Sequence, residues 1–366
     1  MNKYLEEFRS EKAARIISDQ INALQGNTRL TIMEICGGHT LTTMKYGLHT
    51  LLPETLTLKS GPGCPVCVTS TEYIDTAIAL LQEHDVIIAS FGDMLRVPGS
   101  TSTLLKQRSL GRDVRICFSP MDALSIAKEN PGRKTVFLAI GFETTAPGIA
   151  VAIREAEQQG IGNIAFLTAL KTMPQAMKAL LSDPEALIDG FILPGHVTAV
   201  MGTGMYDPVI ETYPIPGVVS GFEPTDMLAS IRTLVEMIIA KKQEIVVQYT
   251  RAVKKEGNTA AQKIMNEVFV TADVSWRGLG TIPGSGLSIA GKYSHLDAEK
   301  KYAVSLPQQK EHPGCICGDV MKGKKTPNQC SLFKQQCTPE NPVGACMVSA
   351  EGSCGIYFNF GRIHGR

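Results

Sequence analysis

Short apolar and β-branched runs recur between Leu30 and Val219 and predict eight strands. Most of these runs start roughly 26 to 29 residues apart, which is the length of one strand plus one crossover helix. Helical stretches such as Ser70–Glu83 and Pro174–Leu181 lie between them. This alternation predicts an α/β fold in which helices cover parallel sheets. The eight runs are Leu30–Ile35, Leu56–Leu58, Val86–Ala89, Val114–Cys117, Val136–Ile140, Ile164–Leu167, Gly190–Leu193 and Gly217–Val219.

The eight strands are expected to form two sheets of four. A closed eight-stranded barrel is the alternative, but polar, turn-rich motifs recur in each half and favour two open sheets. The turn-rich segment Glu129–Gly132 marks the boundary, and a long helix over Thr225–Tyr249 is expected after the second sheet. We therefore predict two doubly wound parallel-sheet domains, residues 1–130 and 131–245, followed by a cysteine-rich iron–sulfur region, residues 246–366.

Polar and reactive residues follow the predicted strands. Ligands of open parallel sheets bind beyond the carboxyl ends of the strands, so these loops are expected to line one cleft. Any one of the carboxylates in them is more often a helix cap than a reactive group. The glycine-rich segment Gly278–Gly286 lacks the lysine of a phosphate loop and is expected to be a turn-rich loop. The candidate cleft-lining residues are Asp93, Glu143, His196 and Glu223.

Cysteines occupy the first two of these loops. Cys64 and Cys67 form a CxxC motif, which is typical of a redox dithiol or of half a metal site. Cys36 ends the preceding strand and is followed by two glycines and His39. A thiolate at Cys36 would suit a soft metal, with His39 as a second ligand or a proton donor. Cys117 lies within an apolar run and is assigned to the core.

Six of the ten cysteines fall between Cys315 and Cys354, near the end of the chain. Four of them, separated by long and uneven gaps, suit an iron–sulfur cluster, which would leave two spare thiols nearby. A structural zinc site usually contains tight cysteine pairs two to four residues apart, which are absent here. A disulfide framework is typical of secreted chains. The four are Cys315, Cys330, Cys337 and Cys354, and the two spare thiols are Cys317 and Cys346.

Charge and hydropathy exclude several classes of partner. The net charge is +1 and there is no extended basic patch, so no nucleic-acid partner is expected. No apolar run is long enough to cross a bilayer, so no membrane span is expected. The segment Met1–Ile16 is charged throughout and lacks an apolar signal core. We expect a cytoplasmic protein.

Several of these motifs together resemble the HypD family of hydrogenase maturation factors. They are CGGHT at Cys36–Thr40, GPGCPVC at Gly61–Cys67, GFETTAP at Gly141–Pro147, PGHV at Pro194–Val197 and CTPENPVGAC at Cys337–Cys346. The resemblance covers essentially the whole chain. It implies two α/β domains and a third that carries a [4Fe–4S] cluster. It also implies a role in assembling the Fe(CN)2CO unit of [NiFe] hydrogenases.

The resemblance further implies partners and residue roles. The partners would be a HypC-type small chaperone, a HypE-type cyanide donor and, indirectly, the hydrogenase large subunit. Cys36 would bind the iron together with the N-terminal cysteine of the chaperone, and Cys64 and Cys67 would be neighbouring redox or iron-associated thiols. By similarity to ferredoxin–thioredoxin reductase, Cys317 and Cys346 would form a redox pair. The cluster ligands would be Cys315, Cys330, Cys337 and Cys354, although the CxC motif leaves open whether Cys315 or Cys317 is the ligand.

We hypothesise a relay of electrons from the cluster to Cys317/Cys346, then to Cys64/Cys67, and finally to the iron at Cys36. A rival interpretation is an iron–sulfur-dependent thiol/disulfide reductase that acts on a protein substrate, which would leave Cys36 and His39 without a role. A non-catalytic iron scaffold and a structural zinc protein are further alternatives. The residues fit a metallocofactor assembly factor with redox activity and do not decide whether it is an enzyme.

Overall fold

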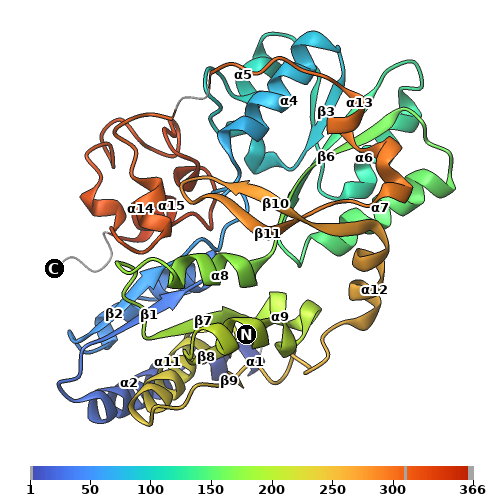
Figure 1. Cartoon of the computed structure of the whole chain (residues 1–366). Coiled ribbons are helices and arrows are strands. Elements are labelled where there is room, and N and C mark those ends of the chain that lie inside the picture. Colours follow the sequence, from blue (N-terminus) through green and yellow to red (C-terminus); the bar gives the residue numbers. More distant parts are fainter. Residues whose placement is uncertain (1–2, 309–310, 362–366) are drawn as a thin grey trace.

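The computed structural model describes residues 3–308 and 311–361 and contains two mostly parallel sheets (Figure 1). The first sheet has five parallel strands in the order β2-β1-β7-β8-β9. It combines the first two and the last two of the predicted runs, so segments far apart in the chain pair directly. The strands are β1 (Leu30–Glu34), β2 (Leu56–Ser60), β7 (Gly190–Pro194), β8 (Gly217–Ser220) and β9 (Ile245–Val247).

The second sheet has six strands in the order β10-β11-β6-β5-β3-β4. The strands β6, β5, β3 and β4 are parallel, and an antiparallel hairpin of β10 and β11 extends the sheet beside β6. The strands are β3 (Ile87–Ser90), β4 (Val114–Ile116), β5 (Thr135–Gly141), β6 (Ile164–Lys171), β10 (Phe269–Trp276) and β11 (Gly280–Ile289). All eight predicted strands are therefore present, and the α/β class is confirmed.

The expected grouping of these strands is wrong. The chain makes β1 and β2 of the first sheet, crosses to build β3 to β6 of the second, and then returns, so that β7 pairs with β1 at Ile32 and Gly190. The sheets thus do not follow the ranges 1–130 and 131–245, and no eight-stranded barrel closes among the described residues. Hydrophobic periodicity predicts which segments are buried strands, but it does not predict which strands pair with each other.

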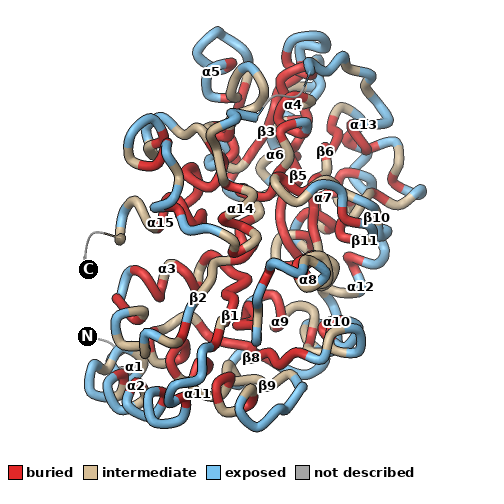
Figure 2. Tube along the Cα trace, turned by 60° about the vertical axis from the view of Figure 1, so that its left-hand side comes forward, coloured by how far each residue is buried: buried red, intermediate tan, exposed pale blue. Residues whose placement is uncertain are grey.

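The strands bury both faces, as parallel strands covered by helices do. On β1, Ile32 packs toward α2 (Glu11–Gln25) and α11 (Pro224–Ile239). Met33, and Ile35 just after the strand, belong instead to a core shared by both sheets. On β7, Ile192 packs into the same core as Ile32, whereas Phe191 packs into the core shared by both sheets. Figure 2 shows this buried core running through the middle of the molecule.

Fifteen α-helices connect and cover the sheets in the described residues. They are α1 (Lys3–Phe8), α2 (Glu11–Gln25), α3 (Gly37–Lys45), α4 (Thr71–Glu83), α5 (Leu104–Ser109), α6 (Pro120–Glu129), α7 (Ala146–Gln158), α8 (Met173–Leu181), α9 (Gly195–Met201), α10 (Asp207–Thr212), α11 (Pro224–Ile239), α12 (Thr259–Val268), α13 (Ala298–Lys301), α14 (Cys317–Met321) and α15 (Ser353–Phe360). None of the described helices is both long and apolar enough to cross a membrane.

Two local predictions also need correction. The helix expected over Thr225–Tyr249 ends at Ile239, and the chain then turns to form β9. The glycine-rich segment Gly278–Gly286 is mostly strand β11 and not a loop. Gly286 is needed there because a Cβ on it would lie 2.3 Å from a methyl carbon of Val274 on the partner strand.

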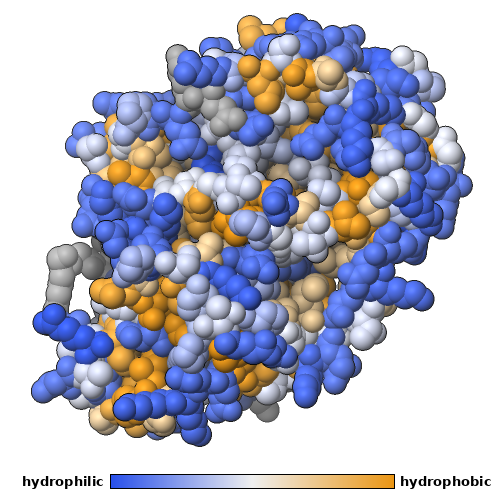
Figure 3. Space-filling model, viewed as in Figure 1, coloured by the Kyte–Doolittle hydropathy of each residue, from blue (hydrophilic) through white to orange (hydrophobic). Residues whose placement is uncertain are grey.

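The cysteine-rich segment folds as short helices and turns beside the carboxyl ends of β1 and β2 (Figure 1). Its buried residues, such as Met321, Cys346 and Met347, belong to the same core as both sheets. It is therefore packed onto the α/β part rather than separated from it. On the face shown in Figure 3, hydrophobic residues form separate patches between hydrophilic ones.

Candidate functional site

Cys36 lies where β1 ends and α3 begins. Its side chain is buried, and the backbone N–H groups of Gly38 and His39 hydrogen bond to the sulfur. Burial, and then the nearby carboxylate of Glu351, raise the pKa of the Cys36 thiol to about 12, although the two N–H groups act in the opposite direction. The thiol is therefore protonated at neutral pH. A soft metal that bound here would have to displace that proton and would then benefit from the helix N-terminus.

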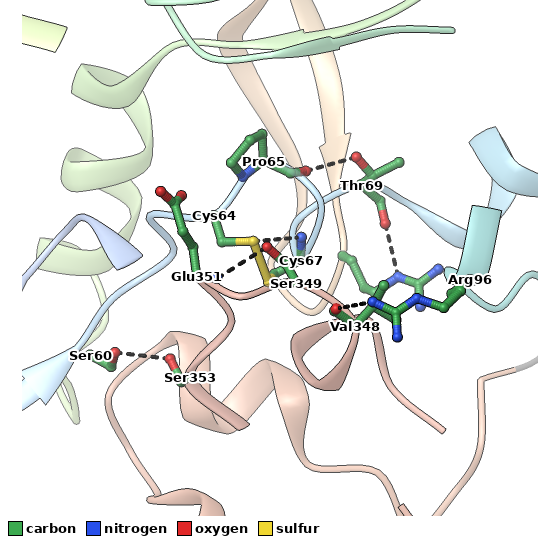
Figure 4. The surroundings of a disulfide bond; sticks show 11 residues. Ser60, Cys64, Pro65, Cys67, Thr69, Arg96, Val348, Ser349, Glu351 and Ser353 are labelled. Atoms are coloured by element: carbon green, nitrogen blue, oxygen red, sulfur yellow. Dashed lines mark hydrogen bonds between the residues drawn. A yellow bond between two sulfur atoms is a disulfide. The ribbon is translucent and has the colours of Figure 1, made fainter. Parts of the chain in front are cut away.

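The Cys64–Cys67 turn follows β2, the neighbour of β1, so the two cysteine loops leave the same sheet edge side by side. Cys64 and Cys67 form a disulfide with Cα atoms 5.3 Å apart, and the Cys67 N–H donates to the sulfur of Cys64 at 3.2 Å (Figure 4). Gly63 allows the loops to touch, since a Cβ on it would lie 2.4 Å from the Cα of Cys36. The structure thus brings all three of these cysteines together.

His39 is fully buried on α3 beside this site. Its ring stacks on Phe222 with centroids 4.7 Å apart, and the ring of His196 lies 5.0 Å from the same Phe222 ring. Neither nitrogen of His39 has hydrogen-bond geometry toward a described residue, although the backbone of Ser220 and Gly221 lies near the ring. Burial, and secondarily His196, lower the pKa of His39 to about 3. The ring is therefore neutral and is poorly suited to donate a proton as an imidazolium.

The predicted cleft-lining carboxylates have different environments. Asp93 is exposed on a 3₁₀ turn, whereas Glu223 precedes α11 and forms a bidentate pair with Arg9 at 2.6 and 2.9 Å. Glu143 is buried and accepts the N–H of Met173 at 2.8 Å, while its second oxygen has no partner among the described residues. Burial raises the pKa of Glu143 to about 7.

Two carboxylates near Cys36 were not predicted from the sequence. Glu34, on β1, is buried and accepts hydrogen bonds from Thr40 at 2.8 Å and Thr43 at 2.5 Å; burial raises its pKa to about 7. Glu351 lies beside the disulfide (Figure 4), and its carbonyl approaches Gly37 so closely that a Cβ there would not fit. A polar residue two positions before Cys36, inside an apolar strand, was the available signal for Glu34.

Four of the six cysteines of the C-terminal segment contact one another through their thiols. The sulfurs of Cys315 and Cys317 are 3.3 Å apart, and Cys346 contacts both Cys317 and Cys354 through its thiol. Hydrogen bonds from Cys317 and Cys346 lower the pKa of Cys354. The remaining two have backbone partners: Cys337 accepts the N–H of Val343 at 3.4 Å, and Cys330 donates to the carbonyl of Gly314 at 3.8 Å.

These thiols have the chemistry of an iron–sulfur donor set. Gly344 leaves them room, because a Cβ on it would lie 2.4 Å from the sulfur of Cys317 and 2.7 Å from that of Cys315. Within residues 3–308 and 311–361, however, no three histidine, cysteine or acidic side chains are arranged so as to hold a metal ion. The donor types fit a cluster.

The backbone of the C-terminal segment at Cys346 adjoins the Cys64–Cys67 turn. Gly352 lies between them, since a Cβ on it would be 3.0 Å from the sulfur of Cys67 and 2.1 Å from the carbonyl oxygen of Cys346. Arg96, in the 3₁₀ turn Gly92–Arg96 after β3, holds the same segment to the second sheet by donating to the carbonyl of Val348 at 3.0 Å (Figure 4). Cys36, the Cys64–Cys67 turn and the Cys346 region therefore form one continuous row. Cys117, by contrast, is buried in the core of the second sheet.

Comparison with known proteins gives consistent matches over the whole chain. A family model described as "HypD: Hydrogenase formation hypA family" matches residues 12–361. A hydrogenase maturation factor HypD from Cupriavidus necator is 40% identical over 369 residues, covering 98% of this chain and 97% of that protein. Proteins of the same name from Rhodobacter capsulatus and Azotobacter vinelandii are 42% identical over 371 residues and 41% identical over 368 residues, and each alignment covers 98% of this chain and 98% or 97% of the relative.

Proposed function

This chain belongs to the HypD family of hydrogenase maturation factors, and from that premise we propose that it is the cytoplasmic redox scaffold on which the Fe(CN)2CO unit of [NiFe] hydrogenases is built. Cys36 binds the iron, which is cargo, together with a HypC-type chaperone. A HypE-type protein delivers cyanide, and the finished unit passes toward the hydrogenase large subunit.

The observation that supports this proposal most strongly is that three cysteine-bearing segments, those of Cys36, Cys64–Cys67 and Cys346, pack against one another in a row. Gly63 holds the Cys64–Cys67 turn against Cys36, and Gly352 holds the same turn against Cys346. Thiol–disulfide exchange requires direct contact between the attacking thiolate and the disulfide, so adjacent thiol sets can pass electron pairs only if the fold packs them together. The row places each cysteine-bearing segment beside the next one.

The residues of the row divide the work. A [4Fe–4S] cluster held by Cys315, Cys330, Cys337 and Cys354 would supply single electrons when bound. A Cys317–Cys346 disulfide takes up two electrons and two protons to become a dithiol. This dithiol reduces the Cys64–Cys67 disulfide by exchange and returns to the disulfide. Cys36 loses its proton when iron binds, and the N–H groups of Gly38 and His39 then stabilise the thiolate.

An iron–sulfur-dependent reductase of a protein disulfide is the second candidate, because the Cys64–Cys67 disulfide could serve as its exchange partner. Both of these cysteines are buried, with 4% and 2% of their surface exposed. A protein substrate would need an exposed sulfur to attack. Burial of the pair, and the presence of Cys36 against it, favour the scaffold.

The test is an infrared spectrum of the chain purified without oxygen from cells that carry the full maturation set. We expect cyanide and carbonyl stretching bands in the wild type, and their loss in Cys36→Ala. Cys117→Ala is the matched control, because it removes an equally buried thiol outside the row. Bands that persist in Cys36→Ala would overturn the assignment of the iron ligand, and maturation that survives both Cys64→Ala and Cys67→Ala would overturn the relay.

A further inference from the structure

A cavity of about 390 Å³ opens beside the first two C-terminal cysteines. It lies where the loop before α5, the end of β10 and the start of the cysteine-rich segment meet. Much of its wall is apolar or glycine, while Arg277, Cys315 and Cys317 supply the reactive and charged part. Glu311 and His312 also line the cavity.

Arg277 places a positive charge in this wall. The residue has only 7% of its surface exposed, and its guanidinium donates to the carbonyls of Thr69 at 2.8 Å and Pro98 at 2.9 Å. Its backbone N–H also donates to the carbonyl of Val68 at 2.9 Å. Because Val68 and Thr69 directly follow the Cys64–Cys67 turn, this arginine is held in place by the same turn that carries the disulfide.

The charge of Arg277 is only weakly compensated. Its one ion pair among the described residues is with Glu311, at 3.8 Å, and that carboxylate is half exposed and also accepts from Thr71 at 3.1 Å. Because this counter-ion is distant and solvated, it neutralises the buried arginine only in part. The positive potential of Arg277 therefore extends into the cavity. The thiols of Cys315, Cys317 and Cys346 are near enough to interact electrostatically with the guanidinium.

The cavity also gives access to the proposed redox pair. Cys317 lines the cavity, and its thiol is also in hydrogen-bonding contact with that of Cys346. A small molecule in the cavity can therefore reach the sulfur of Cys317, whereas Cys346, with 1% of its surface exposed, is closed to solvent. Cys315 lies at the same wall, 3.3 Å from Cys317.

We infer that this cavity binds a small thiol that carries a carboxylate, with the carboxylate paired to Arg277 and the thiol directed at Cys317. The inference rests on the proposed role of Cys317 and Cys346 as a redox pair. The inference adds a soluble anionic thiol as a second source of electrons, and it names Arg277 as the residue that recognises this thiol.

The chemistry is two exchange steps. When the Cys317/Cys346 dithiol has reduced the Cys64–Cys67 disulfide, a Cys317–Cys346 disulfide remains. The bound thiolate attacks the sulfur of Cys317, the bond to Cys346 breaks, and Cys346 leaves as a thiolate that takes up a proton. A second thiolate attacks the outer sulfur of the mixed disulfide, which releases Cys317 and the oxidised small disulfide. Two small thiols are oxidised and one protein disulfide is reduced.

The test compares three thiols of different charge on the full-length holoprotein without oxygen. Mercaptopropionate is anionic, mercaptoethanol is uncharged and cysteamine is cationic. The rate of Cys317–Cys346 reduction is followed by alkylation and peptide mass spectrometry, and is expressed per unit of thiolate so that differences in thiol pKa cancel. We expect the anionic thiol to react roughly tenfold faster than the cationic one, as a charge-assisted contact predicts.

Two variants test the residue in opposite directions. Arg277→Met should abolish the preference for the anionic thiol, and Glu311→Gln, which alters only a half-exposed side chain, should increase it. Arg232→Met removes a partly exposed arginine on α11 and should change nothing. If Arg277→Met fails to fold, the preference of Glu311→Gln for the anionic thiol still tests the inference, because that preference should exceed the wild-type value.

Any of three results overturns the inference. A wild-type protein that reacts equally with all three thiols, or a preference that neither Arg277→Met nor Glu311→Gln alters, would show that Arg277 recognises nothing here. If mild oxidation never yields a Cys317–Cys346 disulfide, the redox pair of the proposed function fails and this inference fails with it. A disulfide that forms but shows no charge preference removes only the inference.

Discussion

The hydroxyl of Ser353 donates a hydrogen bond to the hydroxyl of Ser60 at 2.9 Å, across 293 positions of the sequence (Figure 4). Ser60 ends β2, directly before the loop that carries Cys64 and Cys67, and Ser353 begins α15, directly before Cys354. Ser60 also shares a hydrogen bond of 2.7 Å with Thr40 of α3. One hydroxyl therefore joins α3, which follows Cys36, the end of β2, which leads to Cys64 and Cys67, and α15, which carries Cys354.

Removing this contact should loosen α15. Ser353→Ala deletes one partly buried hydrogen bond, which is worth about 1 kcal/mol, so we expect the α15 amides to exchange about fivefold faster with deuterium. Mass spectrometry of peptides that cover residues 353–360 measures the effect. Ser109→Ala, which removes a hydroxyl bonded only within its own helix end, is the control. Unchanged exchange in α15 would mean that packing alone holds the helix.

Substitution of Gly63 should disrupt the site and the fold around it. In Gly63→Ala the new methyl group would lie 2.4 Å from both the Cα of Cys36 and the carbonyl oxygen of Ile35, which are backbone atoms that cannot rotate away. Overpacking of this kind costs about 1–3 kcal/mol or more. We expect a lower unfolding midpoint in urea and loss of hydrogenase maturation. Gly132→Ala has open space around the new methyl and should match the wild type in both assays.

Glu143 should make stability depend on pH in a defined direction. Its pKa rises from 4.5 unfolded to about 7 in the folded protein, so the folded state binds the proton more tightly. Its contribution is complete below pH 4.5, is lost as the pH rises toward about 7, and is constant above that. The total change is about 3 kcal/mol at most. Urea titrations between pH 5 and 8 should show a shallower fall in Glu143→Gln than in the wild type, and parallel curves would contradict the prediction.

Lys171 should destabilise the protein at neutral pH. It ends β6 with 2% of its surface exposed, and its ammonium faces the ring of Trp276 at 5.6 Å. Burial lowers its pKa from 10.5 to about 7. Protonation therefore disfavours the folded state, and stability lost to this residue at pH 7 is regained as the pH rises toward 10.5.

Lys171→Met keeps an unbranched side chain, one atom shorter, and removes the charge. We expect the variant to be about 1–3 kcal/mol more stable than the wild type at pH 7, with the difference shrinking at higher pH. Chemical denaturation at pH 7 and pH 9.5 measures both values. Lys128→Met, on the surface helix α6, should leave stability nearly unchanged. A destabilised Lys171→Met at pH 7 would show that the amine makes an interaction worth more than its burial costs.

Local patterns in the sequence determined the elements and the positions of the reactive groups on them. The eight apolar runs became strands because buried segments of a parallel sheet are apolar on both faces. The loops with Cys36 and with Cys64 and Cys67 follow adjacent parallel strands, so their shared edge could be predicted. The concentration of six of the ten cysteines near the end of the chain was likewise visible in the sequence alone.

Only the tertiary structure decided which strands share a sheet and which distant residues meet. The insertion of β7 beside β1, the approach of Gly352 to Cys67, and the position of Arg277 beside Cys317 all join segments far apart in the chain. The physical reason is that hydrophobic periodicity records whether a segment is buried, which is a local property. The partner that buries it is chosen by the packing of the whole chain, and short motifs do not encode that choice.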